Sequence, residues 1–192
     1  MVTNDHRLYE ACAADYAALV RDAGGGEEAA PRTVDDICTL LERRLGIAIR
    51  RYPASLGGHP QGVVLRGKDL CLILYERQTS AWHQQAIILH ECAHLLYNHG
   101  GTESGTAAAL RVLIPDVPHE QFAVVLHRAV GAEGHRSEDE RQAEAFATVG
   151  LARLSRMQGQ PLRPVPTAES PDDPAVGVVI RRLLEDFAAG TG

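Results

Sequence analysis

The stretch HECAHLLYNH at residues 90–99 constrains this chain more than any other part of its sequence. It contains the pattern H-E-x-x-H, made by His90, Glu91 and His94. The neighbouring residues are apolar around more than one side of a helix: Ile87, Ile88, Leu89, Leu95 and Leu96. A helix that is apolar on most sides is buried, and buried polar side chains need partners. The sequence therefore predicts a buried helix whose polar residues are held by a partner.

Helix geometry brings the two histidines of this pattern to one side. His90 and His94 differ by about 40° in direction and by about 6 Å in height, so both imidazoles can bind one metal ion. Glu91 points about 100° away from His90 and suits contact with a water beside the ion. Zinc with three protein ligands lowers the pKa of a bound water to about 7. We expect one zinc ion, His90 and His94 as its ligands, and Glu91 as the acid/base that takes a proton from water and returns it to a leaving amine.

A third zinc ligand has to come from elsewhere, and the acidic segment SEDERQAEAFA at 137–147 is the best candidate. Ser137 and Glu140 fit a capping box that opens a helix ending near residue 157. Glu140 and Glu144 flank its apolar face, about 40° apart. One acid can bind the metal while the other orients a ligand imidazole, and the geometry favours Glu140 as the ligand. The predicted inward face contains Ala143, Phe146, Ala147, Gly150, Leu151 and Leu154.

Each of these two acids also has a purely structural interpretation. Glu140 can simply complete the capping box with the Ser137 amide. Glu144 can pair on the surface with Arg141 or Arg153. Both interpretations stay open at the level of the sequence.

Two further residues share the histidine side of the 81–98 helix. His83 lies two turns before His90 and either contacts substrate or pairs with a carboxylate near the helix start. Tyr97 follows His94 by one turn. It either stabilises an oxyanion or packs its ring in the core with its hydroxyl in contact with water.

The rest of the chain predicts an α+β fold in which a small antiparallel sheet packs against a mainly helical body. Helices are expected over 5–23, from the Thr33 N-cap to Gly46, over 81–98 from the Ser80 cap to Gly100-Gly101, and over 137–157. Strands are expected over 47–52, 62–66 and 70–76, the last two as a hairpin. If 70–76 is an edge strand, an extended peptide can pair with it.

The remaining segments are less regular. Helices are expected over 107–113 and 119–130, and a final amphipathic helix over 176–187 follows a Pro-rich connector. We divide the chain into a helix and Gly-rich linker (1–30), a metallopeptidase-like domain (31–157), and the connector with the last helix (158–192).

Composition restricts where the protein works and what it binds. The net charge of −6 argues against direct nucleic-acid binding. The sequence contains no apolar run of 18 residues, so we expect no membrane span. The N-terminus lacks the apolar core of a secretory signal, so we expect a cytoplasmic protein. Its four cysteines, Cys12, Cys38, Cys71 and Cys92, are scattered, which is typical of buried small apolar residues.

The motifs resemble those of a known family. His90-Glu91-Cys92-Ala93-His94-Leu95-Leu96, followed by Glu140-x-x-Ala143-Glu144-x-Phe146-Ala147, is similar to the ImmA/IrrE zinc metallopeptidases, above all their small actinobacterial members, which carry a stretch like YERQTSAWHQQAIILHE. The resemblance covers about residues 33–155. It implies a gluzincin-like fold with the H-E-x-x-H helix at the cleft, and a protein or peptide substrate such as a transcriptional repressor.

One departure from the family pattern leaves an alternative open. The family commonly has Glu immediately before the alanine, where this chain has Gln142. If that position supplies a ligand, metal binding is weakened here. The alternative function is then a non-proteolytic zinc-containing regulatory or binding module of the same fold. A zinc hydrolase of a small amide is a third hypothesis.

Overall fold

The structure is a computed structural model that describes residues 2–22, 30–56, 61–66, 69–99, 125–128 and 138–158. The predicted α+β class is confirmed. The helices are α1 (Val2–Asp22), α2 (Val34–Leu45), α3 (Ala81–Tyr97) and α5 (Glu138–Gln158). The strands are β1 (Ala48–Ala54), β2 (Gly62–Arg66), β3 (Leu70–Glu76) and β4 (Val125–Arg128).

The four strands form one mixed sheet in the order β1-β3-β2-β4. The predicted hairpin is confirmed, since β2 pairs antiparallel with β3. The prediction of an antiparallel sheet is wrong for β1, which runs parallel to β3. The chain does reverse from β1 to β2 and again to β3. However, the hairpin uses one edge of β3 and β1 takes the other, so the first and third strands become parallel neighbours.

The position of β3 rules out peptide pairing with that strand as we predicted it. β3 lies between β1 and β2, so both of its backbone edges are already hydrogen-bonded. Its side chains from Leu70 to Tyr75 are buried on both faces of the sheet, as a continuous apolar run would suggest. Within the described residues, the sheet ends at β1 on one side and at β4 on the other.

The helix predicted over 119–130 is also wrong where the structure describes it. Residues 125–128 form β4, which pairs antiparallel with the outer edge of β2. The backbone of β2 offers this edge to any extended segment, and tertiary pairing of this kind overrides a weak helical period. The helices predicted over 107–113 and 176–187 lie outside the described residues.

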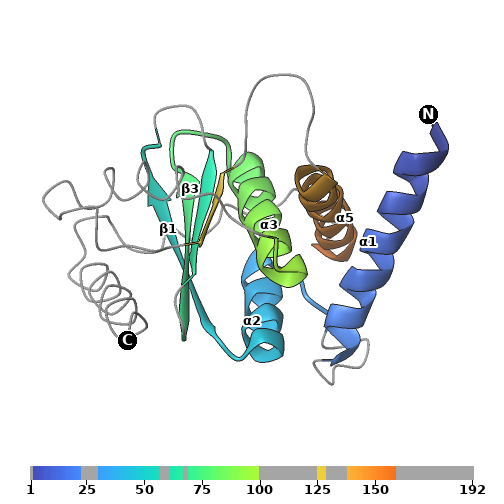
Figure 1. Cartoon of the computed structure of the whole chain (residues 1–192), viewed down its shortest axis with the longest axis horizontal. Helices are drawn as coiled ribbons and strands as arrows, with labels where there is room; N and C mark the ends of the chain where they lie inside the picture. The colour runs from blue at the N-terminus through green and yellow to red at the C-terminus, as the bar shows by residue number, and fades with distance from the viewer. Residues whose placement is uncertain are drawn as a thin grey trace, which may run out of the picture.

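The helices cover one side of the sheet in successive layers (Figure 1). α3 packs directly against β2 and β3, α5 packs on α3, and α1 lies on the far side of α5. The predicted inward face of α5 is confirmed, since all six of its residues are buried. Cys12, Tyr16 and Leu19 of α1 belong to the same apolar core as Ala143 and Phe146 of α5. The proposed division of the chain at residue 30 stays a prediction.

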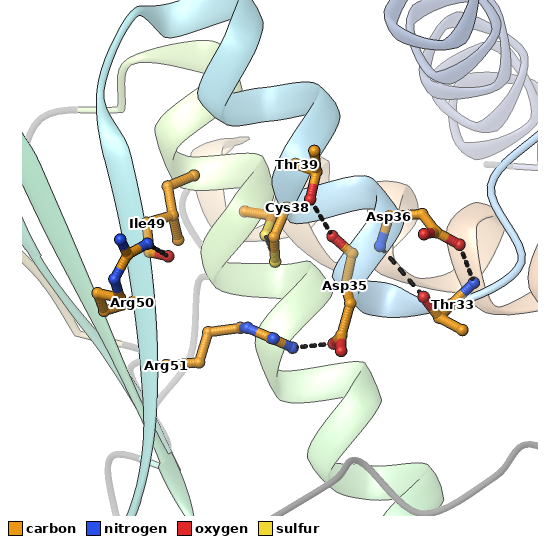
Figure 2. A network of polar contacts seen from close by, with 9 residues as sticks. Thr33, Asp35, Asp36, Cys38, Thr39, Ile49, Arg50 and Arg51 are labelled. Carbon is orange, nitrogen blue, oxygen red and sulfur yellow. Dashed lines mark hydrogen bonds and ion pairs between the residues drawn. The ribbon is translucent and has the colours of Figure 1, made fainter. Parts of the chain in front are cut away.

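α2 shows how local sequence signals position a helix against the sheet (Figure 2). Thr33 and Asp36 form a reciprocal capping box, with Asp36 N donating to Thr33 Oγ1 over 3.1 Å and Thr33 N donating to Asp36 Oδ2 over 2.9 Å. Gly46 ends the helix at φ 69°, a left-handed conformation that suits glycine. Arg51 of β1 pairs with Asp35 of α2, so the helix and the strand are also joined by charge.

None of the described helices is both long enough and apolar enough to cross a bilayer. All four cysteines are free and buried, which confirms their predicted role as small apolar residues. Cys38 of α2 and Cys92 of α3 are in contact, with 3.7 Å between their sulfur atoms.

Candidate metal centre

The helix that carries H-E-x-x-H begins and ends through side chains and turns close to it in sequence. Ser80 caps α3 as predicted, its hydroxyl accepting a bond from the His83 amide over 3.2 Å. α3 ends at Tyr97, one residue before the predicted end, and Asn98 at φ 52° turns the chain there rather than the predicted Gly100-Gly101. Asparagine tolerates this left-handed conformation better than most residues. The early turn returns His99 to the helix, where its amide bonds to the His94 carbonyl over 3.1 Å.

Three side chains converge between α3 and α5. The Nε2 atoms of His90 and His94 are 3.0 Å apart. Glu140 Oε2 lies 3.3 Å from His90 Nε2, and Glu140 Oε1 lies 3.7 Å from His94 Nε2. Among the residues that the structure describes, these three form the single group of His, Cys, Asp or Glu side chains arranged closely enough to hold a metal ion.

The spacing of these atoms fits a small tetrahedral ion. Zinc binds imidazole nitrogen and carboxylate oxygen at about 2.0–2.2 Å, which places neighbouring ligand atoms about 3.3 Å apart. The separations of 3.0, 3.3 and 3.7 Å bracket that value. Two imidazoles and one carboxylate are also a ligand set that zinc uses when it keeps an open position. The donors therefore suit a metal ion such as zinc.

The structure separates the two acids that the sequence left open. Glu140 is largely buried, with 15% of its side chain exposed, and faces the histidines. Glu144 is exposed on the next turn of α5 and is not among the three converging side chains. Its charge still contributes to raising the pKa of His90. Glu140 is thus the acid positioned as a third ligand.

Burial and the nearby acidic charges have opposite effects on the pKa of His90. Burial by itself lowers the pKa of an imidazole, because it disfavours the charged form. The bond to Glu140 and the charges of Glu91, Glu140 and Glu144 outweigh this effect and raise the pKa of His90 above its ordinary value. The centre therefore favours positive charge, as a site for a cation requires.

Glu91 is the most unusual polar residue of the centre. It is completely buried, and neither carboxylate oxygen has a hydrogen-bond partner among the described residues. Burial raises its pKa to about 8, although the neighbouring His90 opposes the rise. Buried polar groups without a partner are rare in native proteins, and they often belong to a site that binds an ion or a water or that carries out catalysis.

Gly62 at the start of β2 makes room for this carboxylate. A Cβ atom at residue 62 would lie 2.5 Å from Glu91 Oε1 and 2.5 Å from Ile87 Cγ2. Both contacts are too short for any side chain to be added without displacing one of its neighbours. This role was not identified from the sequence, although a glycine inside a strand is a known sign of close approach by another group.

The two secondary site residues have protein partners outside the three-residue cluster. His83 Nε2 is 2.5 Å from Gln61 Oε1, so this histidine is paired with an amide rather than with the carboxylate we considered. The Tyr97 hydroxyl donates to Asp15 Oδ2 of α1 over 3.0 Å, and its ring packs on Phe146. Tyr97 is therefore positioned as a core tyrosine that joins α3, α5 and α1. A contact of either residue with substrate stays a prediction.

The sequence did not identify His99 as part of the centre, and it offered Gln142 only as a weakened ligand position. His99 Nδ1 lies 2.9 Å from His94 Nδ1, and His99 Nε2 lies 3.0 Å from Gln142 Oε1. Gln142 thus contacts a histidine behind the cluster rather than the cluster itself. The only sequence signal for this arrangement is the closing histidine of HECAHLLYNH, since Gln142 is 43 residues away.

Comparison of the chain with protein-family models, with curated proteins and with solved structures found no match. The resemblance to the ImmA/IrrE metallopeptidases therefore stays an expectation from the motifs.

Proposed function

We propose that this protein is a zinc-dependent metallo-endopeptidase, of gluzincin type and related to the ImmA/IrrE family, that hydrolyses peptide bonds of a protein partner such as a transcriptional repressor. His90, His94 and Glu140 hold one zinc ion in this proposal. Glu91 is the catalytic acid/base, and Glu144 and Gln142 lie outside the ligand set.

The observation that carries the proposal is the buried carboxylate of Glu91, next in sequence to His90 of the three-residue cluster, for which the described residues supply no hydrogen-bond partner. A buried ionisable group without a partner destabilises the folded chain, so selection for stability alone would replace it with an apolar residue. A catalytic site has a use for such a group, because a carboxylate with a raised pKa accepts and returns a proton near neutral pH.

Each residue then has a defined task. Bound zinc supplies the Lewis acidity that lowers the pKa of water and polarises a carbonyl. Glu91 takes the proton from the attacking water on one of its oxygens and delivers it to the nitrogen of the leaving amine. His90, His94 and Glu140 hold their donor atoms between α3 and α5, and Glu91 follows His90 directly along α3. Gly62 adds no side-chain atom of its own against Glu91 Oε1.

The alternative of a non-proteolytic zinc module rested on Gln142 as a weakened ligand. Gln142 bonds to His99 instead, so an amide at this position does not remove a ligand from the set His90, His94 and Glu140. This observation favours the enzyme over the module.

The test compares the zinc-loaded parent with Glu91→Gln on a proteome-derived peptide library, with cleavage products identified by mass spectrometry. We expect the parent to cut, and the variant to bind one zinc ion but to lose roughly 10³-fold in rate, because only the proton acceptor is lost. Glu138→Gln, an exposed change on α5, serves as the matched control and keeps full activity.

Equal cleavage by Glu91→Gln and the parent would refute this mechanism. Stoichiometric zinc without cleavage by either protein would support the regulatory module in its place.

A further inference from the structure

The C-terminal turn of α3 joins His99 to His94 twice. The His99 amide donates to the His94 carbonyl over 3.1 Å, which the left-handed Asn98 makes possible. The two imidazoles also meet through their Nδ1 atoms, 2.9 Å apart. Both side chains are buried, with 0% of His94 and 6% of His99 exposed. The Tyr97 ring stacks on His99 at a centroid distance of 5.5 Å, which further restricts its orientation.

The contacts at the other side of His99 determine where its proton lies. Gln142 Oε1, 3.0 Å from His99 Nε2, can only accept a hydrogen bond. Asp139 Oδ1 lies 3.7 Å from the same nitrogen and is likewise an acceptor. Reversing the Gln142 amide would turn a donor toward His99, but the Asp139 oxygen favours a proton on Nε2. In a neutral His99 the Nδ1 atom is then an acceptor.

The position of the proton on His99 also fixes the position of the proton on His94. Two nitrogen atoms 2.9 Å apart need one hydrogen between them, and His99 Nδ1 is the acceptor. His94 Nδ1 must therefore carry the hydrogen and donate it. A neutral imidazole has one N–H, so His94 Nε2 keeps its lone pair. Nε2 is the atom of His94 that faces His90 and Glu140.

We propose that Gln142 and His99 are positioning residues that hold His94 in the tautomer able to bind a metal through Nε2. In many zinc sites a carboxylate performs this task by accepting the ligand's second N–H. Here an imidazole accepts it, and a glutamine on another helix fixes that imidazole. The inference rests on the proposed zinc site and gives the Gln142 position a role within it. Loss of such outer partners typically lowers metal affinity by about 10–100-fold.

The first experiment measures zinc affinity by competition with a chromophoric chelator at pH 8. Gln142→Leu removes the acceptor and should weaken zinc binding by roughly tenfold or more. Gln142→Glu keeps an acceptor at the same place and should bind zinc at least as tightly as the parent. Gln61→Leu is the matched control, because it breaks the other glutamine–histidine pair, with His83, and should leave zinc affinity unchanged. Circular dichroism establishes that each variant is folded.

The second experiment reads the tautomers directly in the metal-free protein, by long-range ¹H–¹⁵N correlation of the histidine rings. The parent should show His94 protonated at Nδ1 and His99 protonated at Nε2, and Gln142→Leu should lose this pattern. His94 protonated at Nε2 in the parent, or zinc affinity of folded Gln142→Leu within twofold of the parent, would overturn the inference. A parent that shows the expected tautomers but binds no zinc would instead refute the proposed function.

Discussion

The α2–β1 region and the α3–α5 region both contain charged side chains at helix contacts, and they differ in how these charges are satisfied. Between α2 and β1, Asp35 pairs with Arg51, and Glu42 Oε1 accepts bonds from Ile49 N at 2.6 Å and from Arg50 at 3.2 Å. Between α3 and α5 the polar groups are more deeply buried. Glu91 of α3, which lies close to Gly62 of β2, has no hydrogen-bond partner in the described part of the chain.

The polar residues between α2 and β1 therefore stabilise the fold, whereas Glu91 lowers its stability. A capped and paired polar group contributes about 0.5–2 kcal/mol to stability when it is partly exposed. A buried carboxylate without a partner has the opposite effect. The two regions should therefore respond in opposite ways to substitution, and three predictions test this contrast.

The largest effect concerns the pH dependence of stability in the metal-free protein. The pKa of Glu91 is about 8 in the folded chain against an ordinary 4.5, so the folded state keeps its proton while the unfolded state has lost it. The free energy of unfolding should fall as pH rises from about 4.5 to 8, by on the order of 4 kcal/mol. Urea denaturation in the presence of a chelator measures this fall.

Glu91→Gln is the control for that measurement, because glutamine does not titrate. The variant should lack most of the fall and should be more stable than the parent at pH 8. Parallel pH profiles of the two proteins would show that Glu91 already has a partner when the metal is absent.

The next effect distinguishes the two acids on α5. Glu140→Gln removes the charge of the third ligand and should weaken zinc binding by about 100-fold or more, since neutral amides are poor zinc ligands. Glu144→Gln, one turn away and exposed, should change zinc affinity by less than threefold. Isothermal titration with zinc measures both. A larger loss in Glu144→Gln than in Glu140→Gln would reverse the ligand assignment.

The smallest effect tests the α2–β1 region. Thr33→Ala removes the hydroxyl that accepts from the Asp36 amide, and should lower the free energy of unfolding by about 1 kcal/mol. Zinc affinity should stay that of the parent, because the cap lies outside the three-residue cluster. Urea denaturation and a zinc titration on the same sample check both statements. A tenfold loss of zinc affinity would mean that the two regions are energetically coupled.

Features with local signals were predicted well from the sequence. Thr33 and Gly46 delimit α2 as expected, Ser80 caps α3, and the strands 62–66 and 70–76 pair as a hairpin. Each depends on residues close together in the chain, such as a capping side chain or a tight turn. The grouping of His90 and His94 with an acid of the 137–157 segment was predicted from the H-E-x-x-H motif, the need for a third ligand and helical spacing.

Features set by distant contacts were not predictable in the same way. The neighbours of β3 depend on which edge β1 takes, and β4 depends on the free edge of β2. The bond between His99 and Gln142 joins residues 43 apart. The end of α3 is a different case, since Asn98 carries a local signal that the stronger glycine signal at 100–101 concealed.

The lack of a side chain at Gly62 has a consequence for redesign of this centre. The strand and the helix compete for one volume, because a carbon on Gly62 and an oxygen of Glu91 would be 2.5 Å apart. A carboxylate supplied from the strand would have to replace the one supplied from the helix. Positions 62, 87 and 91 must therefore be chosen together: glycine on the strand goes with Ile87 and a long acid on the helix, and a new group on the strand requires shorter residues at both helix positions.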